Sequence, residues 1–256
     1  RRLWAEVMRD RFGAKDERSW KLRFHTQTAG VSLTAQQPEV NIVRTALEGL
    51  AAVLGGTQSL HTNSFDEALA LPTEQAARLA LRTQQVIAHE SGVVNTIDPL
   101  GGAYYVEELT STLEAQAYEY FDRIEKLGGV IPAIKDNFFQ REIAEASFRY
   151  QAEVESGKRV VVGVNRYIHE DANPIPLLKI DPALEEKQIL RLAAIRATRD
   201  SGAVDVRLGA LREGAAKEGV NLMPLIVEAA RDYATLGEMC EALRDVWGTW
   251  RETPVF

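Results

Sequence analysis

Apolar side chains recur every three to four residues through most of this chain, and two polar strings interrupt that pattern. The helical period predicts helices over residues 3–12, 38–54, 73–91, 104–127 and 139–155. The polar strings, Leu22–Gln27 and Thr57–Asn63, have the length and alternation of strands. Two short apolar runs, 93–97 and 160–164, are predicted as further strands.

The order strand, helix, strand, helix, strand with short connections is typical of parallel βαβ units. We therefore expect an α/β fold in which residues 1–166 form part of a (β/α)8 TIM barrel rather than an open sheet. Prolines interrupt residues 167–182, which are predicted to be a linker. The helical pattern of residues 183–256 predicts a helical C-terminal subdomain.

Composition narrows the class of protein. The 256 residues are 45% apolar and 26% charged, enough for a sizeable core, and the formal net charge of −7 argues against nucleic-acid binding. No apolar run approaches the roughly 18 residues of a membrane helix, and the start lacks a signal-peptide layout, so we expect a cytoplasmic protein. The single cysteine, Cys240, lies on an apolar helix face and is expected to be a small core residue.

The first polar string offers candidate catalytic residues. Its alternation separates a more apolar side, which should meet the covering helices, from a side carrying Arg23, His25 and Gln27, which should face the barrel lumen. His25 and Gln27 come near the C-terminal rim, where barrel enzymes assemble their active sites. The alternative is a strand end whose polar groups only satisfy neighbouring backbone.

The second polar string has no continuous apolar face, which is uncommon for a buried parallel strand. At its end, Asn63 and Glu67 are four residues apart across a predicted helix-like turn, which would stack them on one side. An amide beside a carboxylate suits a pair of vicinal hydroxyls, because the carboxylate accepts two hydrogen bonds and the amide donates or accepts. The alternative is a helix N-cap with a solvated acid.

A metal site is not expected from the histidines. His61 and His89 lie on different predicted elements, without a third ligand at a suitable spacing. His169 lies in the polar linker and is expected to be solvated. The paired glycines at 55, 101 and 128 are typical of helix ends and turns, and no phosphate-binding loop is present.

Five ordered stretches carry a resemblance to a known family. They are RFHTQTAGVSLTAQ at 23–36, GGTQSLHTNSFDEAL at 55–69, ESG at 90–92, DPLGG at 98–102 and VGVN at 162–165. Together they resemble the large-subunit sequence of methylmalonyl-CoA mutase and its acyl-CoA mutase relatives. The likeness extends over essentially the whole chain.

The resemblance implies an adenosylcobalamin-dependent enzyme with a barrel whose axis is threaded by the coenzyme A arm, this chain being the C-terminal part. It implies that His25 and Gln27 contact the acyl-CoA substrate and that Asn63 and Glu67 bind the adenosyl ribose. Gln58 is implied as a further active-site glutamine. The implied reaction is a radical 1,2-rearrangement of the carbon skeleton of a short branched acyl-CoA.

Two departures from the family pattern affect what the resemblance implies. The cobalamin motif Asp-x-His-x-x-Gly is absent, so the cobalt ligand is expected from another chain, a small cobalamin-binding subunit. Val31 stands where some relatives have Trp, so the acyl group stays open among methylmalonyl, isobutyryl, 2-hydroxyisobutyryl and ethylmalonyl.

The opening segment already has a helical pattern and the first residue is not Met, so the chain is expected to be a piece of a longer one. A heteromeric assembly with the N-terminal half of the barrel is therefore expected, and this piece alone should be inactive. One alternative is a noncatalytic assembly or chaperone-like subunit that keeps the fold. Another is a metal-independent barrel lyase, which Lys21 disfavours because it lies at the wrong end of its strand.

Overall fold

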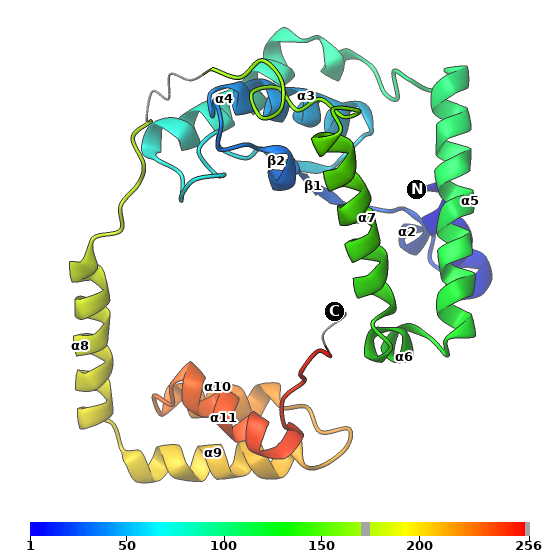
Figure 1. Cartoon of the computed structure of the whole chain (residues 1–256). Helices are drawn as coiled ribbons and strands as arrows, with labels where there is room; N and C mark the ends of the chain where they lie inside the picture. The colour runs from blue at the N-terminus through cyan, green and yellow to red at the C-terminus, as the bar shows by residue number, and fades with distance from the viewer. Residues whose placement is uncertain (170–174, 254–256) are drawn as a thin grey trace. The chain divides into compact units, whose positions relative to one another are not determined.

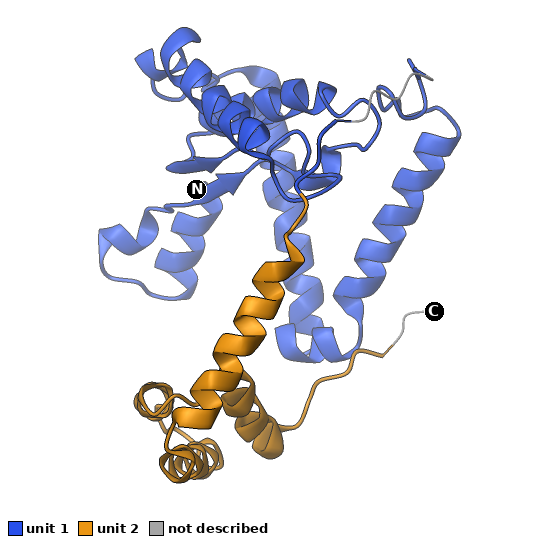
Figure 2. Cartoon of the chain, turned by 90° about the vertical axis from the view of Figure 1, so that its left-hand side faces the viewer, with its two compact units in different colours: residues 1–178, 255 blue, residues 179–254, 256 orange. Residues whose placement is uncertain are grey.

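The computed structural model describes residues 1–169 and 175–253. The chain divides into two compact units, the first comprising Arg1–Leu178 and the second beginning at Lys179 (Figure 2). The division falls within 167–182, the segment expected to be a linker, of which 170–174 lie outside the described residues. His169 is exposed, as expected.

A two-stranded parallel sheet lies at the centre of the first unit. Strand β1, His25–Gln27, pairs with strand β2, Ser59–His61, with His25 opposite Ser59 and Gln27 opposite His61. Helix α3, Val40–Leu54, connects the strands, and helix α4, Glu74–Glu90, follows β2 and packs against α3 (Figure 1). The predicted helices and the parallel strand pairing are confirmed, although each strand is shorter than its polar string.

Small and polar residues let α3 approach the sheet and α4 closely. A Cβ added at Gly49 would lie 3.2 Å from Ile87 Cδ1 on α4 and 3.8 Å from Leu60 Cδ2 on β2. Thr45 and Asn41, one and two turns earlier on the same helix face, are buried. The start of α4 is fixed by Thr73, whose hydroxyl accepts the Ala76 backbone N–H at 3.2 Å as an N-cap.

The predicted alternation of the strands is confirmed. Thr26 and Leu60 are half-buried on the face covered by helices, whereas His25, Gln27, Ser59 and His61 are exposed. A polar sheet face therefore remains open on the side away from α3 and α4.

The prediction of a third strand at 93–97 is wrong. The structure places a short 3-10 helix, η3, at Val93–Asn95, directly after Gly92, which has a φ of 73°. The Ser91 hydroxyl accepts the Val93 backbone N–H at 3.2 Å, so the chain turns instead of extending. Ile97 remains 94% exposed, without the neighbouring strand that an apolar β segment needs.

The apolar run at 160–164 also does not form a strand. Gly163 adopts a φ of 82°, which turns the chain back so that only an isolated bridge joins Val162 to Arg166. The Asn165 side chain accepts the Val161 backbone N–H at 2.8 Å and donates to Val154 O at 2.8 Å. Local side-chain hydrogen bonds therefore replace a strand ladder.

The described residues of the first unit form seven further helices. They are α1 Arg2–Glu6, the π-helix η1 Val7–Arg11, α2 Glu17–Trp20, the 3-10 helix η2 Gly30–Ser32, α5 Tyr104–Lys126, α6 Val130–Lys135 and α7 Phe138–Glu155. Glu142 of α7 accepts a hydrogen bond from the Tyr120 hydroxyl of α5 at 2.6 Å. In the part of the chain that the structure describes, no helix combines the length and apolar character needed to cross a membrane.

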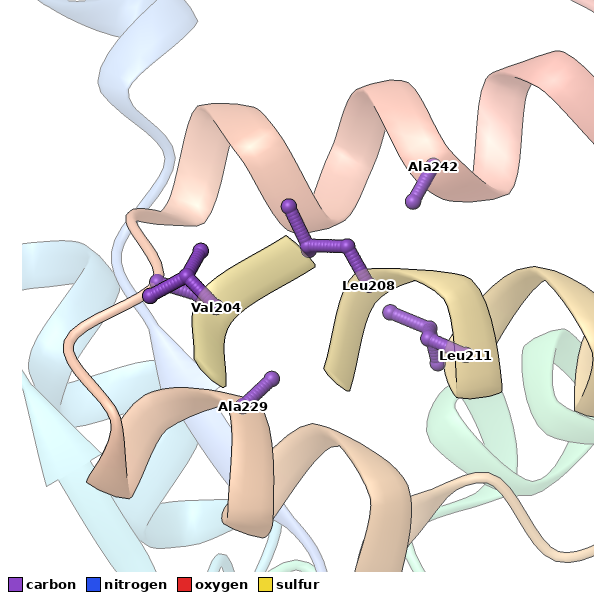
Figure 3. Close-up of a cluster of buried hydrophobic side chains, with 6 residues drawn as sticks. Val204, Leu208, Leu211, Ala229 and Ala242 are labelled. Atoms are coloured by element: carbon purple, nitrogen blue, oxygen red, sulfur yellow. The ribbon is translucent and has the colours of Figure 1, made fainter. Parts of the chain in front are cut away.

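The described residues of the second unit form helices. It contains α8 Pro182–Thr198, α9 Ser201–Ala215, α10 Met223–Arg231 and α11 Leu236–Trp247. Its buried core consists of aliphatic side chains from α9, α10 and α11 and the residue Ala234 between the last two (Figure 3): Val204, Leu208, Leu211, Ala229, Ala234 and Ala242.

The prediction that Cys240 is a core residue is wrong. Its side chain is exposed, because the buried stripe of α11 runs through Ala242 while Met239 and Leu243 pack beside it. Successive helix positions are rotated by about 100°, so a residue between two core positions can point to solvent.

Candidate functional site

The open face of the sheet carries polar side chains from both strands. Because the pairing places His25 opposite Ser59, the His25 Nδ1 atom lies 2.7 Å from the Ser59 hydroxyl. Gln27 and His61 follow as the next pair on the same face. This arrangement leaves the His25 Nε2 atom and the Gln27 amide available for a polar ligand over the sheet.

Asn63 and Glu67 meet at the C-terminal end of β2, as their spacing predicts. The Asn63 amide Nδ2 donates to Glu67 Oε1 at 3.2 Å. Asn63 is buried, at 2% exposed, whereas Glu67 is exposed. The Glu67 carboxylate is therefore accessible from solvent, and the buried Asn63 amide donates a hydrogen bond to it.

The loop after β1 lies against this pair. A Cβ added at Gly30 would come within 3.1 Å of Asn63 Nδ2 and 3.6 Å of Glu67 Oε1, so only a glycine hydrogen leaves this space free. Glu48 of α3 holds the loop in place by accepting hydrogen bonds from the Ala29 backbone N–H at 2.7 Å and from the Ser32 hydroxyl.

Buried side chains that the sequence did not single out hold the turn containing Asn63 and Glu67. The Asn41 amide donates to Phe65 O at 2.9 Å and thereby ties α3 to the turn. Asp66, which is fully buried, accepts hydrogen bonds from both the Thr73 backbone N–H at 2.9 Å and the Thr73 hydroxyl at 3.1 Å. Asp66 directly precedes the candidate Glu67 in the sequence. Its burial, which the sequence does not reveal, distinguishes it as a structural carboxylate from an exposed acid.

Gln58 lies at the opposite end of the strands from the pair of Asn63 and Glu67. Its side-chain Oε1 accepts the Phe24 backbone N–H at 2.8 Å, and its Nε2 donates to Gly56 O at 3.3 Å. The structure therefore brings together His25 with Gln27, and Asn63 with Glu67, but places Gln58 at the N-terminal end of the sheet.

A cavity of about 230 Å³ adjoins the exposed end of β2. It is lined by His61, Thr62, Ser64, Glu67, Pro72, Ala77, Ala80, Leu81 and Gln84. Among the described residues, no cluster of three His, Cys, Asp or Glu side chains could hold a metal ion. The candidate site offers imidazole, amide and carboxylate groups for hydrogen bonding.

Comparisons with known proteins give the family of this chain. A family model described as methylmalonyl-CoA mutase matches residues 1–249. The chain is 48% identical over 257 residues to the 2-hydroxyisobutanoyl-CoA mutase large subunit of Aquincola tertiaricarbonis, covering 100% of this chain and 46% of the relative.

Two further relatives are named methylmalonyl-CoA mutase. The protein of Escherichia coli strain K12 is 48% identical over 244 residues, covering 95% of this chain and 34% of the relative. The mitochondrial protein of Homo sapiens is 45% identical over 249 residues, covering 97% and 33%. The chain thus spans between a third and a half of the length of these relatives.

The fold and the site define an α/β protein with parallel strands, a polar sheet face and an amide–carboxylate pair at the strand ends. A family model matches residues 1–249, so the family within this class of protein is also shown. The chain belongs to the methylmalonyl-CoA mutase family.

Proposed function

We propose that this chain forms the C-terminal part of the catalytic subunit of an adenosylcobalamin-dependent acyl-CoA mutase. In this proposal β1 and β2 are neighbouring strands of a (β/α)8 barrel, and their open polar face lines the lumen. One observation carries the proposal: the sheet has an open polar face, and Asn63 contacts Glu67 at the C-terminal ends of the same strands. That end of a barrel is where active sites assemble.

At the substrate end, His25 and Gln27 bind and orient the acyl thioester. The contact between His25 Nδ1 and the Ser59 hydroxyl holds the ring so that Nε2 faces the open side. A hydrogen bond from Nε2 to the thioester oxygen then orients the acyl group, and Gln27 adds a donor or acceptor beside it. Gln58, at the N-terminal end of the strands, is proposed as a further active-site residue on the cofactor side.

At the cofactor end, the residues fit the ribose of an adenosyl group. The Glu67 carboxylate accepts hydrogen bonds from two vicinal hydroxyls, Asn63 supports it, and the absence of a side chain at Gly30 leaves room beside both. Adenosylcobalamin, when bound, supplies a cobalt–carbon bond whose homolytic cleavage starts the rearrangement. The roles of this chain are to bind, orient and exclude water.

The proposed partners are a small cobalamin-binding subunit, which supplies the cobalt ligand, and the N-terminal half of the barrel, which completes the lumen. The proposed active form is a heteromeric assembly in the cytoplasm. The acyl group is one of the short branched acyl groups named above. Val31, which is 95% exposed on the loop beside Gly30, is a candidate for contacting it.

The test is to assemble the chain with the two missing parts, adenosylcobalamin and acyl-CoA, and to measure isomerisation. We expect His25→Ala to lower kcat/KM about a hundredfold or more and Glu67→Ala at least tenfold, since each removes a directed hydrogen-bonding group. His89→Ala and Glu108→Ala, which change exposed residues of α4 and α5, are the matched controls.

The alternative of a noncatalytic subunit gives a different result. Normal turnover in both the His25 and Glu67 variants would refute the assigned roles. Assembly without any isomerisation of the four candidate acyl-CoA substrates would favour a noncatalytic subunit.

A further inference from the structure

Thr28 makes two reciprocal hydrogen bonds to Asn63 in the interior of the first unit. The Asn63 backbone N–H donates to Thr28 Oγ1 at 2.9 Å, and the Thr28 hydroxyl donates to Asn63 Oδ1 at 3.1 Å. Thr28 and Asn63 are 4% and 2% exposed, so water does not compete readily for either bond. Thr28 directly follows β1, which places its hydroxyl opposite the end of β2.

These two bonds determine which way the Asn63 amide faces. The Thr28 oxygen already accepts a backbone N–H, so its own proton is directed to an acceptor, and that acceptor is Asn63 Oδ1. The Nδ2 group must then lie on the other side, where it donates to Glu67 Oε1. A flipped amide would place Oδ1 against the Glu67 carboxylate, two acceptors without a proton between them.

We propose that Thr28 is a positioning residue that orients the Asn63 amide and, through it, the Glu67 carboxylate for the adenosyl ribose. This inference rests on the proposed function, because the ribose contact belongs to that proposal. Thr28 itself does not touch the ligand: it is buried beneath the pair, and its hydroxyl bonds are both to Asn63. Its effect is transmitted through the single bond between Asn63 Nδ2 and Glu67 Oε1.

The test compares two cobalamins in the full assembly. Adenosylcobalamin carries the adenosyl group, with its ribose, on cobalt, whereas methylcobalamin carries a methyl group there; the corrin ring and the nucleotide tail are the same. Thr28→Val keeps the shape of the side chain and removes the hydroxyl, so we expect the Kd for adenosylcobalamin to rise about tenfold or more, with the Kd for methylcobalamin unchanged. Thr28→Ser, which keeps the hydroxyl, should bind adenosylcobalamin within about threefold of the parent.

Controls separate positioning from a general loss of structure. Thr110→Val removes a threonine hydroxyl that bonds only within the exposed part of α5, to Val106 O at 2.7 Å, and should leave both Kd values unchanged. If Thr28→Val does not fold, Thr28→Ala removes the same hydroxyl with a smaller side chain and is measured in its place. Equal weakening of both cobalamins by a folded Thr28 variant would overturn the inference and leave Thr28 a structural residue.

Asn63→Ala and Glu67→Ala distinguish this inference from the proposed function. If these variants weaken only adenosylcobalamin and the Thr28 variants bind it normally, the positioning role is wrong while the ribose site stands. If Asn63→Ala and Glu67→Ala do not discriminate between the two cobalamins, the ribose site is wrong and the role of Thr28 falls with it.

Discussion

The two units of this chain bury different kinds of side chain. In the described part of the second unit, the buried side chains are all apolar and form one cluster over α9, α10 and α11 (Figure 3). Among the described residues of the first unit, seven polar side chains are buried, and all lie between residues 28 and 66: Thr28, Asn41, Thr45, Thr62, Asn63, Ser64 and Asp66. Apolar packing has no preferred direction, whereas a hydrogen bond fixes the orientation of its partners.

The buried polar side chains of the first unit therefore fix the orientation of the groups that they contact. The buried apolar side chains of the second unit mainly stabilise the packing of its own helices. The first unit also leaves large apolar side chains uncovered along α5 and α7, among them Tyr104, Leu113, Ile143 and Phe148. Such surface is typical of a face that packs against further protein. This agrees with the proposal that the remainder of a barrel completes the first unit.

The largest expected effect tests whether the second unit has its own core. Leu211 is fully buried on α9, so Leu211→Ala should lower the opening free energy of α9, α10 and α11 by about 2–5 kcal/mol, because it removes buried methyl groups and leaves a cavity. Native-state hydrogen exchange followed by mass spectrometry measures this for each unit separately. The control is Leu236→Ala, since Leu236 is 75% exposed; equal losses in the two variants would mean that this core does not stabilise the unit.

An intermediate effect concerns the charged contact in the second unit. Arg199 donates to the Glu238 carboxylate, with Nη1 and Oε2 2.7 Å apart, and holds the pKa of Glu238 down at about 2, helped by hydrogen bonds from Thr235. The ordinary value is 4.5, so the unfolded chain binds a proton first as the pH falls. This stabilisation is complete above pH 4.5 and is lost as the pH falls toward 2. It amounts to about 3 kcal/mol at most.

Glu238→Gln should therefore lower the opening free energy of the second unit at pH 7 and flatten its decline between pH 4.5 and 2, with the first unit unchanged. Glu241→Gln is the matched control, because the pair of Glu241 and Arg244 is 60% and 49% exposed and contributes little. An unchanged acid profile in Glu238→Gln would show that this carboxylate does not carry the pH dependence.

The smallest expected effect lies on the open sheet face. Ser59→Ala removes the hydroxyl beside His25 Nδ1, and both residues are exposed, so the opening free energy of the first unit should change by less than about 0.5 kcal/mol. The 15N resonance of His25 Nδ1 should nevertheless shift, because its hydrogen-bond partner is lost. A large destabilisation would contradict the distinction between a positioning face and a stabilising core.

Features that depend on the local sequence pattern were predicted better than features that depend on pairing between distant segments. The alternation in Leu22–Gln27 predicted which side chains lie on the covered and open faces, and the spacing of Asn63 and Glu67 predicted their contact. The apolar runs at 93–97 and 160–164 were wrongly predicted as strands, because a strand requires a hydrogen-bonded neighbour that composition does not reveal.

By itself, the sequence determined the helices, the two faces of the polar strings and the family to which the chain belongs. These depend on periodicity and on ordered residue strings, which are local properties. Only the tertiary structure decided that Thr28 meets Asn63, that Gly30 lies against Glu67, and that Gln58 is at the far end of the strands. Such contacts join residues 34 to 37 positions apart, and they exist only once parallel pairing sets the register of β1 against β2.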